Sequence, residues 1–172
     1  MPVVLLALLA ACSPDAVPGA APRCRSVQRM ALVAQAAPDA AYLPCVTELA
    51  EGWQDAGFVA RPGRVRFTLE PGRAGGRTVR VGLAESCDGA AGAPMAARAA
   101  GVRTSVHLRS ISPRYAGTIT DEFAGGCVTY EFDFERGAHI PLMEELLGTV
   151  GLVSRRDLGL RLERELRTEL DR

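Results

Sequence analysis

Apolar and polar residues alternate one by one over several stretches of this chain, a two-residue period that is typical of β-strands. The longest unbroken run is 128–134, where Val, Tyr and Phe alternate with Thr, Glu and Asp. Similar alternation predicts strands over 65–69, 79–83, 102–109 and 115–123. The turn residues of 71–76 predict a hairpin between the first two of these. Strands with one apolar and one polar face indicate an antiparallel sheet that is covered on one side only.

Three other segments repeat their apolar residues every three or four positions, which is the period of an α-helix. They are 25–37, which ends before Pro38 because proline has no N–H for the helix; 141–150; and 154–170, where Ser154 and Asp157 resemble a capping box. The predicted apolar positions are Val27, Met30, Ala31 and Ala34 in the first helix, and Leu158, Leu162, Leu166 and Leu170 in the last. Trp53, in a short turn, is expected to anchor the core. The order of elements predicts an α+β fold, a twisted antiparallel β-sheet of about five strands with one N-terminal and two C-terminal helices.

The N-terminus carries a different pattern. The apolar run Val3–Leu9 leads into Leu9-Ala10-Ala11-Cys12, and a proline-rich polar stretch follows. A short apolar run, small residues and a cysteine are typical of a bacterial lipoprotein signal, in which the cysteine receives lipid and becomes the mature N-terminus. The run of seven apolar residues is too short to span a bilayer, which takes about 20. Met1-Pro2 lacks the basic residues of an export signal, so we expect these upstream.

This pattern sets the expected domain organisation and location. We expect residues 1–11 to be a lipoprotein signal peptide, 12–23 a lipidated tether with Cys12 as the lipidation site, and 24–172 a single globular domain. The protein would then be held on the outer face of the cell membrane by its lipid. The formal net charge is zero, which argues against nucleic acid as a partner.

The cysteines indicate the redox compartment. If Cys12 carries lipid, Cys24, Cys45, Cys87 and Cys127 remain, an even number that predicts two disulfides in an exported chain. Four cysteines allow three pairings, and joining near neighbours favours Cys24–Cys45 and Cys87–Cys127. The sequence has no CxxC pair and no HxxxH, so we expect neither a metal nor a cofactor.

The clearest candidate site is a polar stripe on the uncovered face of the sheet. It would place Arg103, His107 and Arg109 of one strand opposite Glu131 and Asp133 of another, with Arg114 and Tyr115 at the rim. The stripe is explained either by cross-strand charge pairs on a solvated face or by a polar groove for an anionic ligand or a partner loop. The leucines of the last helix would dock on the sheet or on a neighbouring helix of the same domain, or else on a partner helix.

Catalytic motifs such as G-x-S-x-G, a P-loop or H-E-x-x-H are absent from the sequence. The sequence therefore favours a non-enzymatic binding or accessory module of the cell envelope, with an envelope protein as a possible partner. Two alternatives stay open. One is a cell-wall enzyme that uses His107 or His139 with nearby carboxylates, and the other is a carrier for a small apolar ligand.

Several segments from Cys24 onward resemble a family of exported proteins from high-GC Gram-positive bacteria. All twenty basic residues are arginine, which fits a GC-rich genome. The resemblance implies an uncharacterised membrane-anchored or lipoprotein-like protein of the envelope, and it carries no catalytic residue. The matching segments are Arg29–Ala36, Tyr42–Cys45, Ala100–Thr104, Ile111–Thr118, Gly125–Phe132 and Ser154–Arg156.

Overall fold

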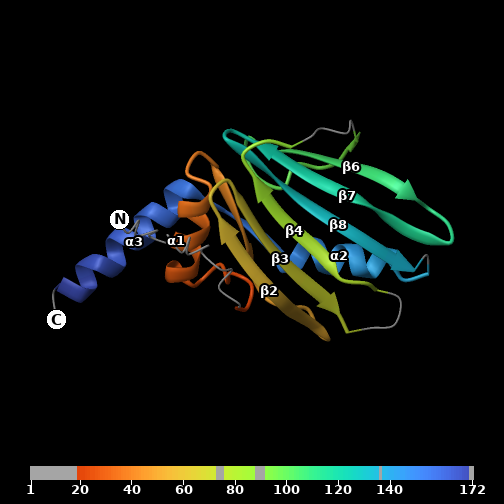
Figure 1. Ribbon diagram of the computed structural model, residues 1–172, viewed down its shortest axis with the longest axis horizontal. Helices are drawn as coiled ribbons and strands as arrows, with labels where there is room; N and C mark the ends of the chain where they lie inside the picture. Colours follow the sequence, from red (N-terminus) through yellow and green to blue (C-terminus); the bar gives the residue numbers. More distant parts are fainter. Residues whose placement is uncertain (1–18, 73–75, 88–91, 136, 171–172) are drawn as a thin grey trace, which may run out of the picture.

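A large antiparallel sheet organises the chain in the computed structural model, which describes residues 19–72, 76–87, 92–135 and 137–170 (Figure 1). The predicted signal peptide, Cys12 and residues 13–18 of the tether lie outside the described residues. The sheet has the strand order β2-β3-β4-β8-β7-β6-β5. Its strands are β2 (Trp53–Arg61), β3 (Arg64–Pro71), β4 (Val79–Ala84), β5 (Ala93–Pro94), β6 (Arg103–Ser110), β7 (Arg114–Phe123) and β8 (Gly126–Glu135).

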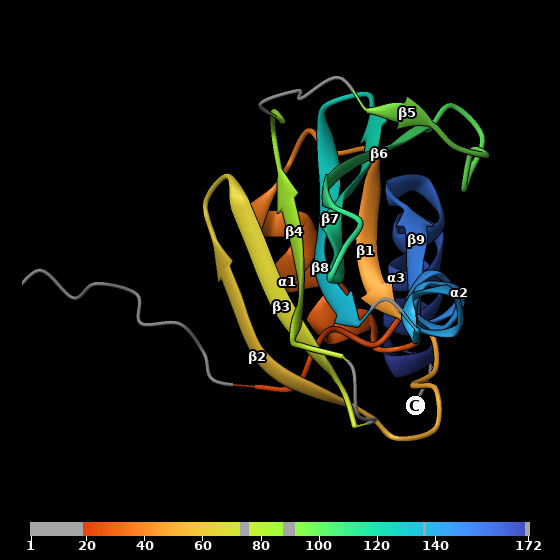
Figure 2. The same ribbon diagram turned by 90° about the vertical axis from the view of Figure 1, so that its right-hand side faces the viewer.

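A second layer covers one face of this sheet (Figure 2). It contains a small antiparallel sheet of β1 and β9, together with three helices. The α+β class and the three helices are confirmed. The expected five strands are too few, because the described residues form seven strands in the large sheet and two in the small one. The elements of the second layer are α1 (Val27–Ala36), β1 (Tyr42–Val46), α2 (His139–Thr149), β9 (Val150–Ser154) and α3 (Arg155–Leu170).

The core lies between the two layers. The strands with unbroken alternation turn their apolar residues inward, and Phe67, Tyr130, Phe132 and Phe134 are among the largest fully buried side chains. Burial of such side chains is the main favourable term in folding. Trp53 is buried as expected, but it begins a nine-residue strand rather than a turn.

The buried face of α1 differs in part from the predicted one. Val27 and Met30 are buried as expected, but the other buried positions are Val33 and Ala36. Ala31 and Ala34 are only partly buried. The helix therefore packs along positions three residues apart, which is also a helical period.

Both predicted disulfides are present. Cys24 and Cys45, with Cα atoms 5.0 Å apart, join the start of α1 to β1. Cys87 and Cys127, with Cα atoms 6.0 Å apart, join the segment after β4 to the start of β8. The sequence separations of 21 and 40 residues correspond to about 3 and about 4 kcal/mol of stabilisation in the chain-entropy model.

The packed body begins before Cys24. Ala21 is fully buried, and its N–H donates to the Asp55 carboxylate at 2.9 Å. The Val46 N–H donates to the Pro22 carbonyl at 2.7 Å. Residues 21–23, which the sequence assigns to the tether, thus pack against the domain.

Among the leucines of the predicted α3 stripe whose side chains the structure describes, those near the start of the helix contact the body and Leu166 does not. Ser154 caps the helix, because its hydroxyl accepts from the Asp157 N–H at 3.0 Å, as the capping pattern predicts. Leu158 is buried, Leu162 packs partly against the core, and Leu166 is 59% exposed. Figure 1 shows the end of α3 extending away from the sheet. No helix among the described residues is long and apolar enough to cross a membrane.

Candidate functional site

One face of the large sheet has no described helix or strand over it (Figure 2). Strand alternation directs the polar side chains of β3, β4, β8, β7 and β6 onto this face, which we call the outer face. Its side chains are mainly arginines, threonines and acidic residues, whereas the apolar partners on the same strands are buried. A sheet face of this kind is available to a ligand.

A hollow of about 330 Å³ lies at the centre of the outer face, and we call it the central trough. Its floor follows one row of the sheet, in which Gly82 pairs with Thr129 and Thr129 pairs with Thr120. The floor is low at Gly82 because glycine has no side chain. A Cβ atom added there would stand only 3.1 Å from the Thr129 hydroxyl oxygen. The trough is lined by Arg64, Val65, Arg66, Gly82, Leu83, Ala84, Ser86, Cys87, His107, Thr118, Thr120, Thr129 and Glu131.

Three arginines stand at one end of the trough, namely Arg61, Arg64 and Arg66, and we call them the arginine cluster. All three are exposed, and with Val59 they line a second hollow of about 260 Å³. The two hollows adjoin, since Arg64 and Arg66 line both. None of the three forms an ion pair within the described residues. Arg61 and Arg64 are direct partners in the β2–β3 ladder, where like charges repel.

The predicted polar stripe lies on the outer face, but its charge pairs differ from those expected. Strand β7 separates β6 from β8. Arg103 therefore pairs with Glu122 of β7 instead of Glu131. Glu131 pairs with Arg80 of β4, with 3.4 Å between Nη1 and Oε2.

The remaining stripe residues divide between the trough and its surroundings. His107 and Glu131 both line the trough, on either side of Thr118 in one row of the sheet. Arg109 lines a neighbouring hollow with Glu131 and Asp133.

The two residues expected at the rim have other positions. Arg114 is held by Asp133, with 2.5 Å between Nε and Oδ1. Tyr115 lies on the inner face, where its ring stacks on Phe132 at 5.6 Å and contacts the His139 ring at 4.5 Å. Tyr115 is therefore not part of the outer site. Alternate residues of a strand point to opposite faces of the sheet, and the position of Tyr115 in β7 points to the inner face.

Of the two histidines considered as catalytic residues, His107 lies on the outer face. His107 has no carboxylate within ion-pair distance among the described residues, and Glu131 is engaged by Arg80. The described residues also contain no group of three or more His, Cys, Asp and Glu side chains that could hold a metal ion. A hollow of about 230 Å³ with a largely apolar lining lies between α1 and β2 and includes Leu32, Phe58 and Pro62.

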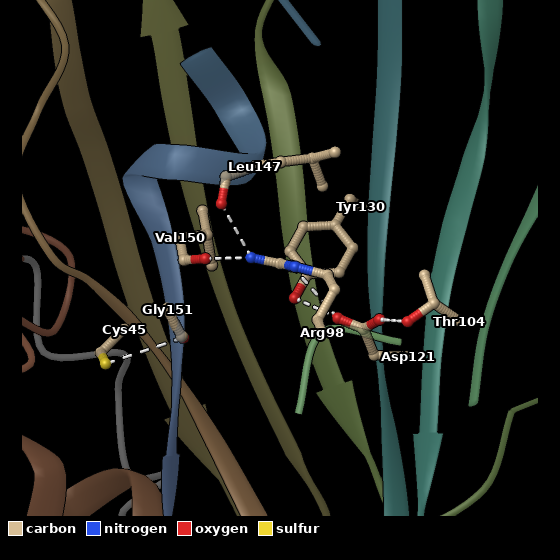
Figure 3. A network of polar contacts seen from close by, with 8 residues as sticks. All are labelled: Cys45, Arg98, Thr104, Asp121, Tyr130, Leu147, Val150 and Gly151. Carbon is tan, nitrogen blue, oxygen red and sulfur yellow. Dashed lines mark hydrogen bonds and ion pairs between the residues drawn. The ribbon is translucent and has the colours of Figure 1, made fainter. Parts of the chain in front are cut away.

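A buried polar network lies on the inner side of the sheet (Figure 3). Asp121, which is fully buried, accepts hydrogen bonds from Thr104 at 2.7 Å and from Tyr130 at 2.8 Å. Arg98 forms an ion pair with Asp121 at 3.1 Å and donates to the carbonyls of Leu147, at 2.9 Å, and Val150.

The network links three strands of the large sheet to the junction of α2 and β9. Burial raises the pKa of Tyr130 well above its usual value of 10.0, and Arg98, 5.0 Å from the ring centre, acts in the opposite direction. Because each charged or hydroxyl group has a partner inside the protein, we assign the network a structural role.

Comparisons with protein-family models, with curated protein sequences and with solved structures found no match to this chain. The fold and the outer face define an α+β domain with one open, polar sheet face and a basic cluster at one end of a trough.

Proposed function

We propose that this protein is a membrane-anchored extracytoplasmic lipoprotein, a non-enzymatic module of the cell envelope that binds an anionic ligand on its outer face. The observation that carries the proposal is the arginine cluster, which has no acidic partner in the described structure and borders the central trough. The other arginines of the same face, such as Arg80 and Arg103, are paired with carboxylates.

The electrostatics of the cluster favour an anion. Arg61 and Arg64 face each other, and Arg66 is two residues further along β3, so three positive charges lie close together. A bound phosphate or carboxylate would offset this repulsion and accept paired hydrogen bonds from the planar guanidinium groups. A hydrogen bond to a charged group contributes about 1.5–3 kcal/mol. Such a site needs no catalytic group, which agrees with the lack of catalytic motifs.

The envelope location is supported by three features. The Leu9-Ala10-Ala11-Cys12 stretch has the pattern of a lipoprotein signal. Two disulfides are typical of an oxidising compartment outside the cytoplasm. The resemblance of several segments to exported proteins implies the same location.

The binding proposal is tested by calorimetric titration of the full chain with inorganic phosphate and with tripolyphosphate. The test variant is Arg64→Gln/Arg66→Gln, and the matched control is Arg80→Gln/Arg103→Gln, which removes two paired arginines from the same face. We expect the test variant to lose at least tenfold in affinity for tripolyphosphate, about 1.4 kcal/mol, and the control to change by less than threefold. Equal losses in the two variants, or no binding by the unmodified chain, would overturn the proposal.

The anchor is tested separately with Cys12→Ser. Without the cysteine that receives lipid, the protein should move from the membrane fraction to the soluble fraction. Cys87→Ser/Cys127→Ser, which removes cysteines but keeps Cys12, is the control and should stay with the membrane. An unchanged distribution of Cys12→Ser would contradict the lipid anchor.

A further inference from the structure

The chemistry of the central trough changes along its length. Its β3 end is basic, whereas the middle is formed by Gly82 and by the hydroxyls of Thr129, Thr120 and Thr118. These threonines are partly exposed, so their hydroxyls can both donate to and accept from a ligand. The positive charge without an acidic partner is therefore confined to one end of the site.

The middle of the trough disfavours a second negative charge. The Glu131 side chain is 48% exposed and borders the trough. It forms an ion pair with Arg80 of β4, and its exposed part still presents a carboxylate to the trough. A linear polyanion that lies across the sheet would place further charges near this carboxylate. A neutral ligand segment with hydroxyl groups would instead donate hydrogen bonds to it.

The trough also has the shape for an extended ligand. From β3 to β6 there are four strand spacings, or about 19 Å at about 4.8 Å each. This length exceeds a single phosphate group. Gly82, Thr129 and Thr120 are small residues in one row of the sheet, so a sugar ring can lie on this row without meeting a large side chain.

From this arrangement we infer that the ligand is an acidic saccharide, whose phosphate or carboxylate group lies on the arginine cluster and whose neutral sugar part lies on the threonine floor. Glu131 accepts from sugar hydroxyls, and His107 stands at the far rim. This inference rests on the proposed anion-binding function and specifies its ligand class.

The experiment compares four probes with the full chain by calorimetry at constant ionic strength: inorganic phosphate, tripolyphosphate, a panel of hexose 1-phosphates and hexuronic acids, and the matching neutral hexoses. We expect at least one acidic sugar to bind about tenfold or more tightly than phosphate, from two or three added hydrogen bonds. The neutral hexoses should bind more weakly than the acidic sugars, because they lack the group that engages the arginine cluster.

Variants separate the two parts of the site. Gly82→Val fills the floor of the trough, so it should remove the tenfold gain of the acidic sugar over phosphate. Glu131→Gln/Thr129→Val should reduce the same gain at least threefold. Arg64→Gln/Arg66→Gln should weaken phosphate and acidic sugars alike. The fluorescence of Trp53, which is buried, reports whether each variant is folded.

The possible failures are distinguishable. If phosphate binds at the arginine cluster but no acidic sugar exceeds it, the saccharide inference is overturned and the anion-binding proposal stands. The same holds if tripolyphosphate exceeds every acidic sugar, since the ligand is then a polyanion. If no probe binds, both are overturned. If Gly82→Val and Glu131→Gln/Thr129→Val, both folded, keep the full gain, the sugar lies elsewhere and the inference is overturned.

Discussion

Replacement of Arg98 by methionine should destabilise this protein far more than replacement of a surface arginine. Asp121 is fully buried, and only 15% of the Arg98 side chain is exposed, so the variant leaves a buried carboxylate without its cation. Removal of one partner from a buried ion pair costs about 3–5 kcal/mol. The carbonyls of Leu147 and Val150 also lose a donor. A loss of about 4 kcal/mol would be a large part of the 5–15 kcal/mol that is typical of a domain.

Equilibrium unfolding in urea measures this loss. Trp53 is the single tryptophan and is 4% exposed, so its fluorescence follows the unfolding of the core. With a urea dependence of about 2 kcal/mol per molar, the midpoint should fall by about 2 M. Arg103→Met is the control: Arg103 is 81% exposed and pairs with Glu122 at the surface, where an ion pair contributes about 0–1 kcal/mol.

A loss below about 1 kcal/mol in Arg98→Met, or one equal to that of Arg103→Met, would refute the assignment of a structural role to the network. If Arg98→Met does not fold, Arg98→Met/Asp121→Leu keeps the test possible. Removal of both charges takes away the unpaired carboxylate, and the double variant should be more stable than Arg98→Met. A double variant that is no more stable would show that the charge on Asp121 is not the source of the loss.

Two other predictions concern the core and its crosslinks. Because burial raises the pKa of Tyr130, the folded state keeps a phenol proton that the unfolded chain releases; stability should therefore be unaffected by this group below pH 10 and fall as the pH rises above it. Ultraviolet titration of tyrosinate should show this ionisation only with unfolding, and Tyr130→Phe should lose that part of the alkaline destabilisation. Cys24→Ser/Cys45→Ser and Cys87→Ser/Cys127→Ser should lower stability by about 3 and about 4 kcal/mol in the urea assay. Peptide mapping without reduction should find the pairs 24–45 and 87–127, and a crossed pairing would contradict the structure.

The strands that the sequence predicts well are those with unbroken alternation. β3 and β4 turn alternate residues into the core along their whole length, and β8 does so from Val128 onward, so a local pattern contains the information about which face is buried. β2 was not predicted, because a register shift between Ala56 and Phe58 reverses the parity halfway along the strand. Gly57, with a φ of 63°, adopts the backbone conformation that this irregularity needs.

The small sheet was missed for a different reason. Val150 continues the apolar band of α2, so the helical period extends into the residues that form β9. Its partner is β1, where Val46 pairs with Val150, and the two strands are about a hundred residues apart in the chain. No local period can identify a strand whose partner is so distant, because the pairing is set by tertiary packing.

The candidate site shows the same division between local and distant information. Alternation correctly placed Arg103, His107 and Glu131 on the outer face. It did not show that β7 lies between their strands or that β4 lies next to β8, and this order joins Gly82 to Thr129 and forms the trough. Arg64 and Arg66 were visible in the sequence as polar residues of an alternating strand. Their position beside a hydroxyl-lined floor depends on the strand order.

The zero net charge of the chain conceals how differently its arginines are used. Arg98 is paired inside the core, and Arg155 donates to the carbonyls of Ala34 and Ala40 near the end of α1. Arg64 and Arg66 have neither kind of partner among the described residues. Arg98 and Arg155 stabilise the fold, and their hydrogen-bond donors are occupied inside the protein. An exposed arginine beside the trough contributes little to stability, and its donors stay available to a ligand. Substitution of the arginine cluster should therefore affect binding with little change in unfolding, and substitution of Arg98 should act through unfolding.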